Sequence, residues 1–378
     1  MNLSSLESSP KYQKIFDTLR QEILAGRYQT GQKLPSEADL VKQFGASRIT
    51  IGRAVRDLQE QGLIERRAGS GTYVRQVKSS GLTFGLLIPN LGQTDIFEPI
   101  CQGMADVSRN SQHALLWSTI PDDASRSEQA WQICQQYIDR RVSGVFFAPL
   151  EFTAEDGPVN RRIAAALEKA RIPIVLLDRC YLPYPQRSRH DLVGINNRRA
   201  GYQVTEHLLQ LGSRRIAFVA YPNSATTIEA RISGYREALY LHGVAINPGL
   251  IQRMNVENQK EIQAFMERER PEAFVCANDH TAGNLMHALL ALGYRIPDQV
   301  RIVGIDDVGY ASMLPVALTT VHQPCREIGM VAMNIMLDRL AHPELPTRDT
   351  LLAAKLIVRD SCGAPRRNSS SGSEASPE

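Results

Sequence analysis

Apolar residues recur at helical spacing in three segments near the start of the chain. The first predicts a helix over residues 10–25, ended by Gly26, whose inward residues are Tyr12, Ile15, Leu19 and Ile23. Ser36 can cap a second helix that ends before Gly45 and turns inward Leu40, Val41 and Phe44. A third helix begins at Ser47 and ends at Gly62, with a core stripe of Ile51, Ala54, Val55 and Leu58. These segments predict a small helical domain.

Residues 62–76, GLIERRAGSGTYVRQ, predict a β-hairpin with a glycine-rich tip after the third helix. Gly69 and Gly71 have no side chain that would hold the backbone away from a phosphate or the minor groove. The basic residues of this segment are Arg66, Arg67 and Arg75. A helix-turn-helix followed by such a β-wing is typical of DNA-binding domains, although the tip alone also fits an ordinary hairpin.

The exposed face of the third helix carries side chains suited to DNA. The face opposite the core stripe carries Ile49, Arg53, Arg56 and Glu60. Arg48 and Thr50 flank this face in the first turn. A helix that presents arginines and small polar groups from its first two turns is suited to reading the major groove. The alternative is that these arginines only solubilise the domain.

From residue 83 onwards, short apolar runs alternate with amphipathic helical stretches. The runs are TFGLLIP, ALLWSTI, GVFFAPL, IPIVLLD, RIAFVA, EAFVCA and VRIVGID, and the helical stretches include AGYQVTEHLLQLG and TAGNLMHALLALG. This alternation predicts parallel sheets covered by helices on both faces, and about 280 residues favour two such lobes over one large sheet. We therefore expect an α/β protein overall, in which an α+β winged helix precedes a two-lobed α/β domain with parallel sheets.

Polar residues stand directly after four of these runs, at the strand ends where ligands bind in open parallel sheets. They are Asn90, Asp178 with Arg179, Asn278 with Asp279, and Asp306 with Asp307. Carboxylates, amides and an arginine at a cleft, with Phe97 or Tyr181 to stack on a ring, suit a neutral polyhydroxylated ligand such as a sugar. For any one of these residues the alternative is a simple helix cap, as for Asp279.

The charge of the chain is concentrated in the first domain. Residues 1–78 hold 13 Lys and Arg against 8 Asp and Glu, while the remainder holds 30 against 32. A basic small domain on a near-neutral body is the electrostatic footprint of a nucleic-acid-binding head. No apolar stretch reaches the roughly 18 residues of a membrane helix, and the start has no export-signal pattern, so we expect a cytoplasmic protein without membrane contact.

Cysteines and possible catalytic groups give no sign of an enzyme. The six cysteines lie far apart without a CxxC pair, which predicts reduced, mostly buried thiols. Asp178 or the adjacent pair Asp306 and Asp307 could be nominated for sugar hydrolysis, but no nucleophile–base set, phosphate-binding loop or metal-ligand spacing accompanies them. We expect no catalytic residue, no metal and no cofactor.

The N-terminal segment resembles the winged helix of the GntR regulator family over residues 11–75. The resemblance rests on the turn GQKLPSE, the helix start SRIT, the exit GLI and the wing tip GSGT. It implies that Arg48 and Thr50 contact the DNA groove. It also implies that Glu37 and Ser47 lie near the DNA backbone and that Gly71 enters the minor groove. The predicted DNA-binding residues are Ser36, Glu37, Ser47, Arg48, Thr50, Arg53, Arg56, Arg67, Gly69 and Gly71.

One position departs from the GntR pattern. The family commonly has a basic residue two positions after Thr50, where this chain has Gly52 followed by Arg53. Arg53 is our hypothetical replacement for that contact. Because a glycine inside a helix costs about 1 kcal/mol relative to alanine, Gly52 marks either a close approach to DNA or a less stable helix.

Residues 83–360 resemble the LacI-type sensor domain, itself similar to periplasmic sugar-binding proteins. The motifs are IPIVLLDR, GYQVTEHLLQLGSRRIAFVA, ARISGY, FVCANDHTA, IPDQVRIVGIDDVGY and LTTVHQP. The resemblance implies that sugar hydroxyls are held by Asp178, Arg231, Asn278 and Asp306, and that TDIFEPICQGM places Asp95 and Phe97 at the cleft mouth. The predicted effector site is thus Asn90, Asp95, Phe97, Asp178, Arg231, Asn278 and Asp306. Asn196 departs from the family, where many members have Asp.

A GntR-type head on a LacI-type body is the combination of arabinose-repressor-like regulators. We expect a winged helix over residues 8–75, a linker over 76–82, an effector-binding and dimerisation domain over 83–362, and a disordered tail over 363–378. The resemblance implies a homodimer on a near-palindromic double-stranded operator. It further implies a repressor whose operator affinity falls when a neutral sugar binds.

Other functions fit the same sequence features. An activator or a corepressed regulator would have the same architecture. A sugar-binding module without a DNA function is opposed by the basic wing. A GntR head can also be fused to a pyridoxal-phosphate enzyme, but the body has no aminotransferase-like pattern.

Overall fold

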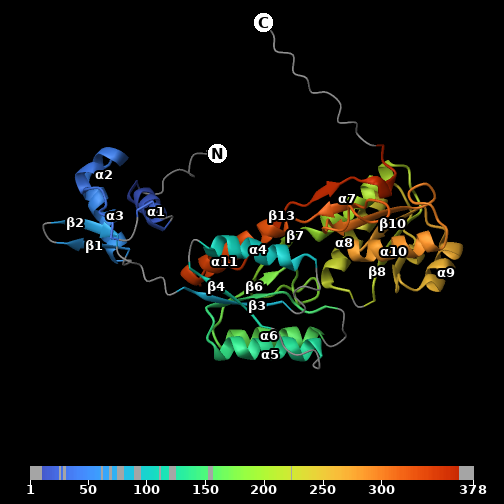
Figure 1. Cartoon of the computed structure of the whole chain (residues 1–378), viewed down its shortest axis with the longest axis horizontal. Coiled ribbons are helices and arrows are strands. Elements are labelled where there is room, and N and C mark those ends of the chain that lie inside the picture. Colours follow the sequence, from blue (N-terminus) through green and yellow to red (C-terminus); the bar gives the residue numbers. More distant parts are fainter. Residues whose placement is uncertain are drawn as a thin grey trace, which may run out of the picture. The chain divides into compact units, whose positions relative to one another are not determined.

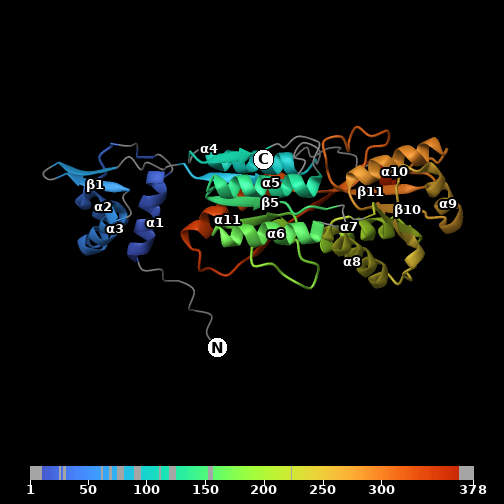
Figure 2. The ribbon, with the colours of Figure 1, turned by 90° about the horizontal axis from the view of Figure 1, so that it is seen from below.

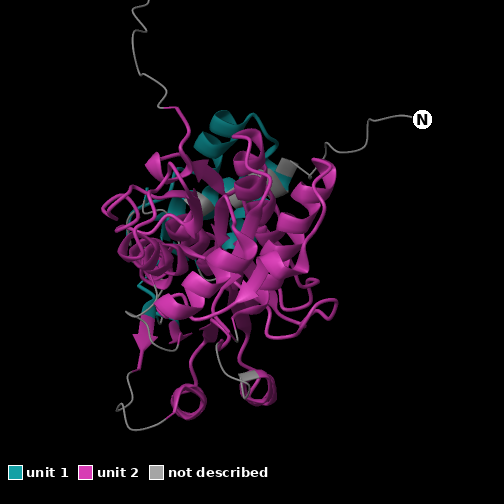
Figure 3. Ribbon diagram, turned by 90° about the vertical axis from the view of Figure 1, so that its right-hand side faces the viewer, with its two compact units in different colours: residues 1–82, 108–114 teal, residues 83–107, 115–378 magenta. Residues whose placement is uncertain are grey.

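The computed structural model describes residues 11–24, 27–28, 31–60, 63–67, 70–74, 81–88, 95–109, 112–118, 125–151, 156–222 and 224–365. Figures 1 and 2 show the helices and strands, and Figure 3 colours two compact units. The first unit comprises residues 1–82 with 108–114, and the second comprises residues 83–107 with 115–378. Among the described residues, no helix is long and apolar enough to cross a membrane.

The described part of the first unit consists of three helices and a two-stranded wing (Figure 1). Its elements are α1 (Lys11–Leu24), α2 (Glu37–Phe44), α3 (Arg48–Glu60), β1 (Ile64–Arg67) and β2 (Gly71–Val74). The predicted inward stripe of the third helix is buried, as is Leu19 of α1. The predicted helices and wing are therefore confirmed, while Gly26 and Gly62 lie outside the described residues.

Local capping determines where α2 begins and ends. The Ser36 Oγ accepts a hydrogen bond from the backbone N–H of Asp39, and the Asp39 carboxylate accepts one from the backbone N–H of Ser36, each at 3.2 Å. This reciprocal pair satisfies N–H groups that the start of a helix leaves without partners. Gly45 ends the helix with φ at 56°, a left-handed conformation that costs glycine little.

The second unit contains two six-stranded sheets (Figures 1 and 2). The strands of the first lobe are, in spatial order, β13 (Asp349–Leu352), β7 (Asp191–Ile195), β6 (Ile174–Leu177), β5 (Gly144–Phe147), β3 (Thr83–Leu87) and β4 (Ala114–Trp117). Those of the second lobe are β14 (Lys355–Ile357), β12 (Thr319–His322), β11 (Arg301–Asp306), β10 (Ala273–Cys276), β8 (Ile216–Ala220) and β9 (Ile251–Arg253). The central strands are parallel, as predicted, and β14 joins β12 antiparallel.

Helices cover both faces of the first sheet. They are α4 (Phe97–Arg109), α5 (Arg126–Asp139), α6 (Asp156–Lys169) and α11 (Cys325–Ala341). Val145 and Phe147 of β5 belong to one core cluster with residues of α5 and α6. Gly144 of the same strand lies against Met336 of α11, on the opposite face. The alternation along β5 therefore places one helix pair on each side of the sheet (Figure 1).

The second sheet is covered in the same way. Its helices are α7 (Asn197–Gln210), α8 (Thr226–Leu241), α9 (Gln259–Glu269) and α10 (Asp279–Ala291), with short 3₁₀ turns at Pro248–Leu250 and Asp360–Cys362. Ala217 and Val219 of β8 share a core cluster with residues of α9 and α10. Phe218 points the other way and packs edge-on against Tyr235 of α8, with ring centroids 5.7 Å apart.

The chain passes between the lobes at three places: from β7 to α7, from β12 to α11, and from β13 to β14. The seven predicted strands are all present, but β7, β9, β12, β13 and β14 were not predicted. Of the strands that were not predicted, β9 and β14 have only 3 residues, and β13 alternates between exposed and half-buried positions. Neither their length nor an apolar run identifies these three strands in the sequence.

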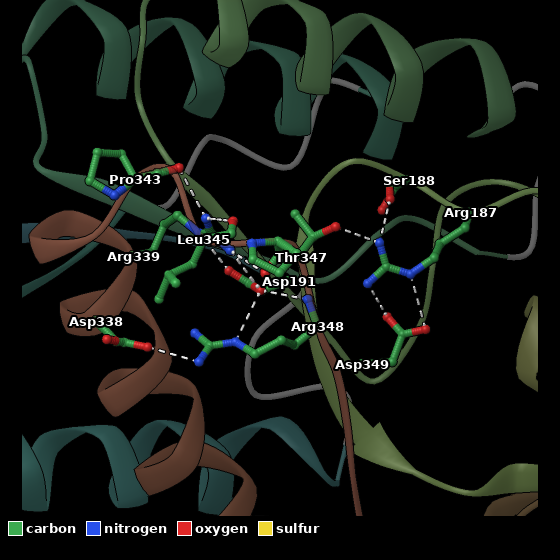
Figure 4. A network of polar contacts seen from close by, with 11 residues as sticks. Arg187, Ser188, Asp191, Asp338, Arg339, Pro343, Leu345, Thr347, Arg348 and Asp349 are labelled. Atoms are coloured by element: carbon green, nitrogen blue, oxygen red, sulfur yellow. Dashed lines mark hydrogen bonds and ion pairs between the residues drawn. The ribbon is translucent and has the colours of Figure 1, made fainter. Parts of the chain in front are cut away.

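A buried carboxylate in β7 binds the part of the chain between α11 and β13 (Figure 4). Asp191, at the start of β7 and 1% exposed, accepts hydrogen bonds from the Arg339 side chain at 2.9 and 3.1 Å. It also accepts one from the backbone N–H of Arg348 at 2.8 Å. The Asp191 carboxylate therefore connects the end of α11 and the segment before β13 to β7. A carboxylate in a buried position needs hydrogen-bonding partners of this kind.

Glycines allow α7 and α8 to cross in close contact. A Cβ on Gly234 of α8 would lie 1.9 Å from the Arg198 carbonyl oxygen of α7. A Cβ on Gly201 of α7 would lie 2.1 Å from the Arg231 carbonyl oxygen of α8. The two helix backbones would have to separate if either glycine gained a side chain.

Gly234→Ala is expected to lower the free energy of unfolding of the second unit by about 1–3 kcal/mol, because its Cβ overlaps a backbone oxygen. The matched control is Gly283→Ala in α10, where the added Cβ would meet its nearest atom at 3.4 Å. That variant should instead gain about 1 kcal/mol of helix stability. Urea unfolding followed by circular dichroism measures both, and equal midpoints for the two variants would contradict the close crossing.

Candidate functional site

The first turn of α3 is held by Ser47 and Thr50, both predicted DNA contacts. The Ser47 Oγ accepts a hydrogen bond from the Thr50 backbone N–H at 3.2 Å and lies 2.8 Å from the Thr50 Oγ. Ser47 thus satisfies one of the N–H groups at the helix start. The structure gives these two hydroxyls a local structural role, and their role towards DNA stays a prediction.

Ser36 and Glu37 also have partners inside the first unit. Ser36 is occupied by the capping pair with Asp39. The Glu37 carboxylate forms an ion pair with Arg66 of the wing and lies 3.9 Å from the Arg48 guanidinium. The Arg48 side chain is nevertheless 83% exposed, so its guanidinium remains accessible to another charged group.

Two of the predicted DNA-binding arginines stack on tyrosines. The Arg53 guanidinium lies over the Tyr12 ring of α1, 4.0 Å from its centroid, and Arg67 lies over Tyr73, 4.6 Å from its centroid. Such cation–π contacts are weakly stabilising at exposed sites. Arg56 is exposed on the same helix as Arg53.

Gly71 begins the second strand of the wing with φ at 123°, a conformation that side chains rarely adopt. A Cβ there would lie 2.5 Å from the Lys33 side chain. Gly71 therefore keeps the wing close to Lys33, which pairs with Tyr73 in an isolated bridge. Gly69 lies outside the described residues.

The second unit contains a cavity of about 490 Å³ lined by residues of both lobes. Six of the seven predicted effector-binding residues line it: Asp95, Phe97, Asp178, Arg231, Asn278 and Asp306. The seventh, Asn90, lies outside the described residues. The structure thus brings together side chains that are more than 200 residues apart in the sequence. Asp178, Asn278 and Asp306 stand at the carboxyl ends of β6, β10 and β11, whereas Phe97 and Arg231 come from α4 and α8.

Arg231 is the buried cation of this cavity. It is 4% exposed and donates hydrogen bonds to the Asn197 Oδ1, at 2.8 Å, and to the Ala277 carbonyl oxygen. Its guanidinium also lies 3.6 Å from the Asp306 carboxylate. Burial raises the pKa of the Asp306 carboxyl, and the positive charge of Arg231 offsets only part of that rise.

Asp178 leaves one buried acceptor free. Its side chain is 5% exposed, and its Oδ1 has no hydrogen-bond partner, while Oδ2 lies 3.3 Å from the Arg179 guanidinium. The residue adopts φ at 67° directly after β6, where the Asp178 backbone passes close to Gly194. A buried carboxylate oxygen without a partner requires a donor, and a ligand hydroxyl can provide one.

Asn278 caps the N-terminus of α10. Its Oδ1 accepts hydrogen bonds from the Thr281 backbone N–H at 2.9 Å and from the Thr281 Oγ at 2.6 Å. The suggestion that Asp279 is the cap is therefore wrong. Asp279 is fully buried inside the first turn and accepts a hydrogen bond from the Thr320 Oγ at 2.6 Å.

Asp95 and Phe97 line another part of the cavity. Tyr310 of the second lobe donates a hydrogen bond to the Asp95 Oδ2 at 3.2 Å, which joins the lobes. Phe97 lines the cavity and is 3% exposed, with Arg179 over its ring at 5.7 Å. Tyr181, the other candidate for stacking, does not line this cavity but packs against the first-lobe core near His190.

Asn196 and Asn197 have different roles. The Asn196 side chain caps α7 through the Arg199 backbone N–H at 3.0 Å and is not among the cavity residues. Asn197 positions Arg231, as described above. Asp307, adjacent to Asp306, pairs instead with Arg359 at 2.7 Å, away from the cavity lining.

Several cavity residues were missed from the sequence. Glu151 is the clearest, because it directly follows the apolar run GVFFAPL and forms an ion pair with Arg179. Burial raises the pKa of the Glu151 carboxyl, and Arg179 opposes this rise. The others with polar side chains are Arg126, Tyr221, Ser224, Thr227, Glu257, His280 and Thr281. No strand ending in the sequence indicates Arg126, which begins α5, or Glu257, which lies in the turn between β9 and α9.

Carboxylates outnumber arginines in the lining of the cavity. Its lining includes five carboxylates, Asp95, Glu151, Asp178, Glu257 and Asp306, and three arginines, Arg126, Arg179 and Arg231. Within the described residues, no group of three His, Cys, Asp or Glu side chains could hold a metal ion. Four cysteines are buried, whereas Cys101 and Cys180 are half-buried.

Comparison with known proteins identifies both parts of the chain. Residues 11–74 match the family described as bacterial regulatory proteins, gntR family. Residues 205–362 match the periplasmic binding protein-like domain. A LacI family transcriptional regulator of Enterococcus faecium, solved with bound ribose, shares the fold with a TM-score of 0.60 and 23% identity, over 74% of this chain and 98% of its own.

Two relatives extend the likeness along the chain. The arabinose metabolism transcriptional repressor of Geobacillus stearothermophilus is 27% identical over 93% of this chain and 97% of its own length. The ribose operon repressor of Halalkalibacterium halodurans is 28% identical over 75% of this chain and 80% of its own. The chain therefore joins a GntR-type helix-turn-helix domain to a periplasmic-binding-protein-like domain, and these two relatives are transcriptional repressors of arabinose metabolism and of the ribose operon.

Proposed function

We propose that this protein is a sequence-specific DNA-binding repressor whose operator affinity falls when a small sugar occupies the cavity of the second unit. The observation that carries the proposal is the pairing of a GntR-type head with a cavity lined by the buried residues Asp178 and Arg231 and by Asp306. A ligand that binds one arrangement of the lobes better than another shifts the operator affinity by that difference.

The ligand that fits best is a neutral sugar, and a pentose is the first candidate. The Asp178 Oδ1 has no hydrogen-bond partner and can accept a hydrogen bond from a sugar hydroxyl group. The Phe97 ring gives the cavity an apolar surface. Each arginine near a predicted contact already faces a carboxylate, so little positive charge is left for a sugar phosphate. The names of the arabinose and ribose repressors favour pentoses.

We also propose that the protein works as a cytoplasmic homodimer without enzymatic activity. One winged helix reads only a short half-site, so two heads on a near-palindromic operator would supply the affinity. The relatives are regulators. Asp178 and Asp306, the carboxylates nominated for catalysis, are engaged with or adjacent to arginines of the cavity.

Asp178→Asn is expected to weaken sugar binding about tenfold or more, because it removes a charged acceptor from a hydroxyl group while keeping the side-chain size. Isothermal titration of the purified protein with arabinose, ribose and xylulose measures the effect. The matched control is Asp298→Asn, whose side chain is 71% exposed and lies outside the cavity lining. Equal affinities in the two variants would remove Asp178 from the site.

Arg48→Ala is expected to weaken operator binding by about 1–3 kcal/mol, since it removes an exposed donor from the start of α3. Fluorescence anisotropy with a duplex selected from a random library measures the loss. Arg295→Ala removes the same charge from an exposed position of the second unit and should leave the affinity unchanged. If both variants bind as the unchanged protein does, Arg48 makes no contact.

Adding the sugar should lower operator affinity about 5- to 150-fold, the usual range of coupling between two sites. The same anisotropy experiment, repeated with saturating sugar, tests this. A higher affinity with sugar would favour the corepressed alternative, and an unchanged affinity would contradict coupling. The mass of the complex by light scattering should correspond to two chains on one operator.

A further inference from the structure

Ile49 is an unusual residue on the surface of the first unit. It lies in the first turn of α3 and is 86% exposed. Among the described residues of that unit, it is the one large apolar side chain that is mostly exposed. A single exposed apolar residue needs no explanation in general, but this one is on the helix that the proposed function directs to the major groove.

Gly52 lies one turn further along the same face of α3. A Cβ at this position would meet no atom within 4 Å, so neither packing nor backbone conformation requires a glycine. Glycine here makes the helix less stable than alanine would, and it leaves a shallow notch beside Ile49, because residues three apart are neighbours on a helix.

The neighbouring arginines leave this notch open. Arg53 does not cover Gly52, because its guanidinium lies over the Tyr12 ring of α1. Arg48 and Arg56 are exposed on either side of Gly52, four residues away in each direction. The result is an apolar spot between two cations, which complements a groove whose walls are phosphates.

We propose that Ile49, beside the notch at Gly52, contacts the C5 methyl group of a thymine in the major groove and makes that base pair part of the operator sequence. This inference rests on the proposed function. Thymine is the one base with an apolar group on its major-groove edge, whereas cytosine presents an amino donor at the neighbouring position. Cytosine has no methyl group at C5, so an isoleucine placed there would lose the apolar contact that it makes with thymine.

Substituting deoxyuridine for thymine tests the contact, since it removes only the methyl group. The full-length protein first selects duplexes from a random library, and each thymine of the selected operator is then replaced singly. One thymine in each half-site should lose about fourfold in affinity, the value of one buried methyl group. The Ile49→Ala variant should bind the thymine and deoxyuridine duplexes with equal affinity at that position. The Ile49→Val variant should again prefer thymine.

The outcomes separate the two proposals. If no sequence is enriched, the proposed DNA-binding function fails. If an operator is selected but no thymine is sensitive, or if Ile49→Ala keeps the full preference, the Ile49 contact is overturned. Because Ile49 is exposed, its variants should melt at the temperature of the unchanged protein, and this measurement excludes misfolding as the cause.

Gly52→Ala tests the notch separately. Its Cβ has open space, so the head should become more stable to heat. Operator affinity should nevertheless fall severalfold, on thymine and deoxyuridine duplexes alike, because the helix is held away from the groove. Unchanged affinity would overturn the close approach at Gly52.

Discussion

The geometry of the sensor cavity depends on how the Arg231 guanidinium is buried. A buried cation is costly unless charged and polar partners replace water. Here the partners come from three elements: Asn197 at the start of α7, Ala277 after β10 and Asp306 at the end of β11. Gly201 lets α7 approach the Arg231 backbone itself. The close crossing of α7 and α8 and the shape of the cavity are therefore parts of the same constraint.

The pairing of the charged side chains in the cavity then determines which class of ligand it can bind. Asp306 faces Arg231, and Glu151 faces Arg179, so most of the charge is compensated within the protein. Asp178 is the exception, because one of its oxygens has no donor. The lining has more carboxylates than arginines, so the site offers hydrogen-bonding groups without an excess of positive charge, and contacts within the protein hold these groups in place. These are the properties that favour a neutral sugar over a phosphorylated one.

In the first unit, several of the residues predicted to contact DNA also make contacts that stabilise the domain. Ser36 and Ser47 cap helices, Glu37 binds Arg66 of the wing, and Arg53 stacks on Tyr12. The Glu37–Arg66 pair joins α2 to the wing, and the Arg53–Tyr12 contact joins α3 to α1. Arg48 and Ile49 at the start of α3, and Arg53 and Arg56 further along it, nevertheless remain exposed.

Hydrophobic periodicity and strand ends are local features, so the sequence by itself determined the helices of the head, the wing, the two α/β lobes and the cavity residues Asp178, Asn278 and Asp306. Asp95 and Arg231 were predicted only through the resemblance to LacI-type sensor domains. It did not mark short or half-exposed strands such as β9 and β13, nor Glu257 and Arg126 in the cavity. Only the tertiary structure decided that Asn278 is a cap, that Tyr181 belongs to the core and that Arg53 lies on Tyr12. These roles depend on which partner lies within a few ångströms, and that distance is set by packing between segments far apart in the chain.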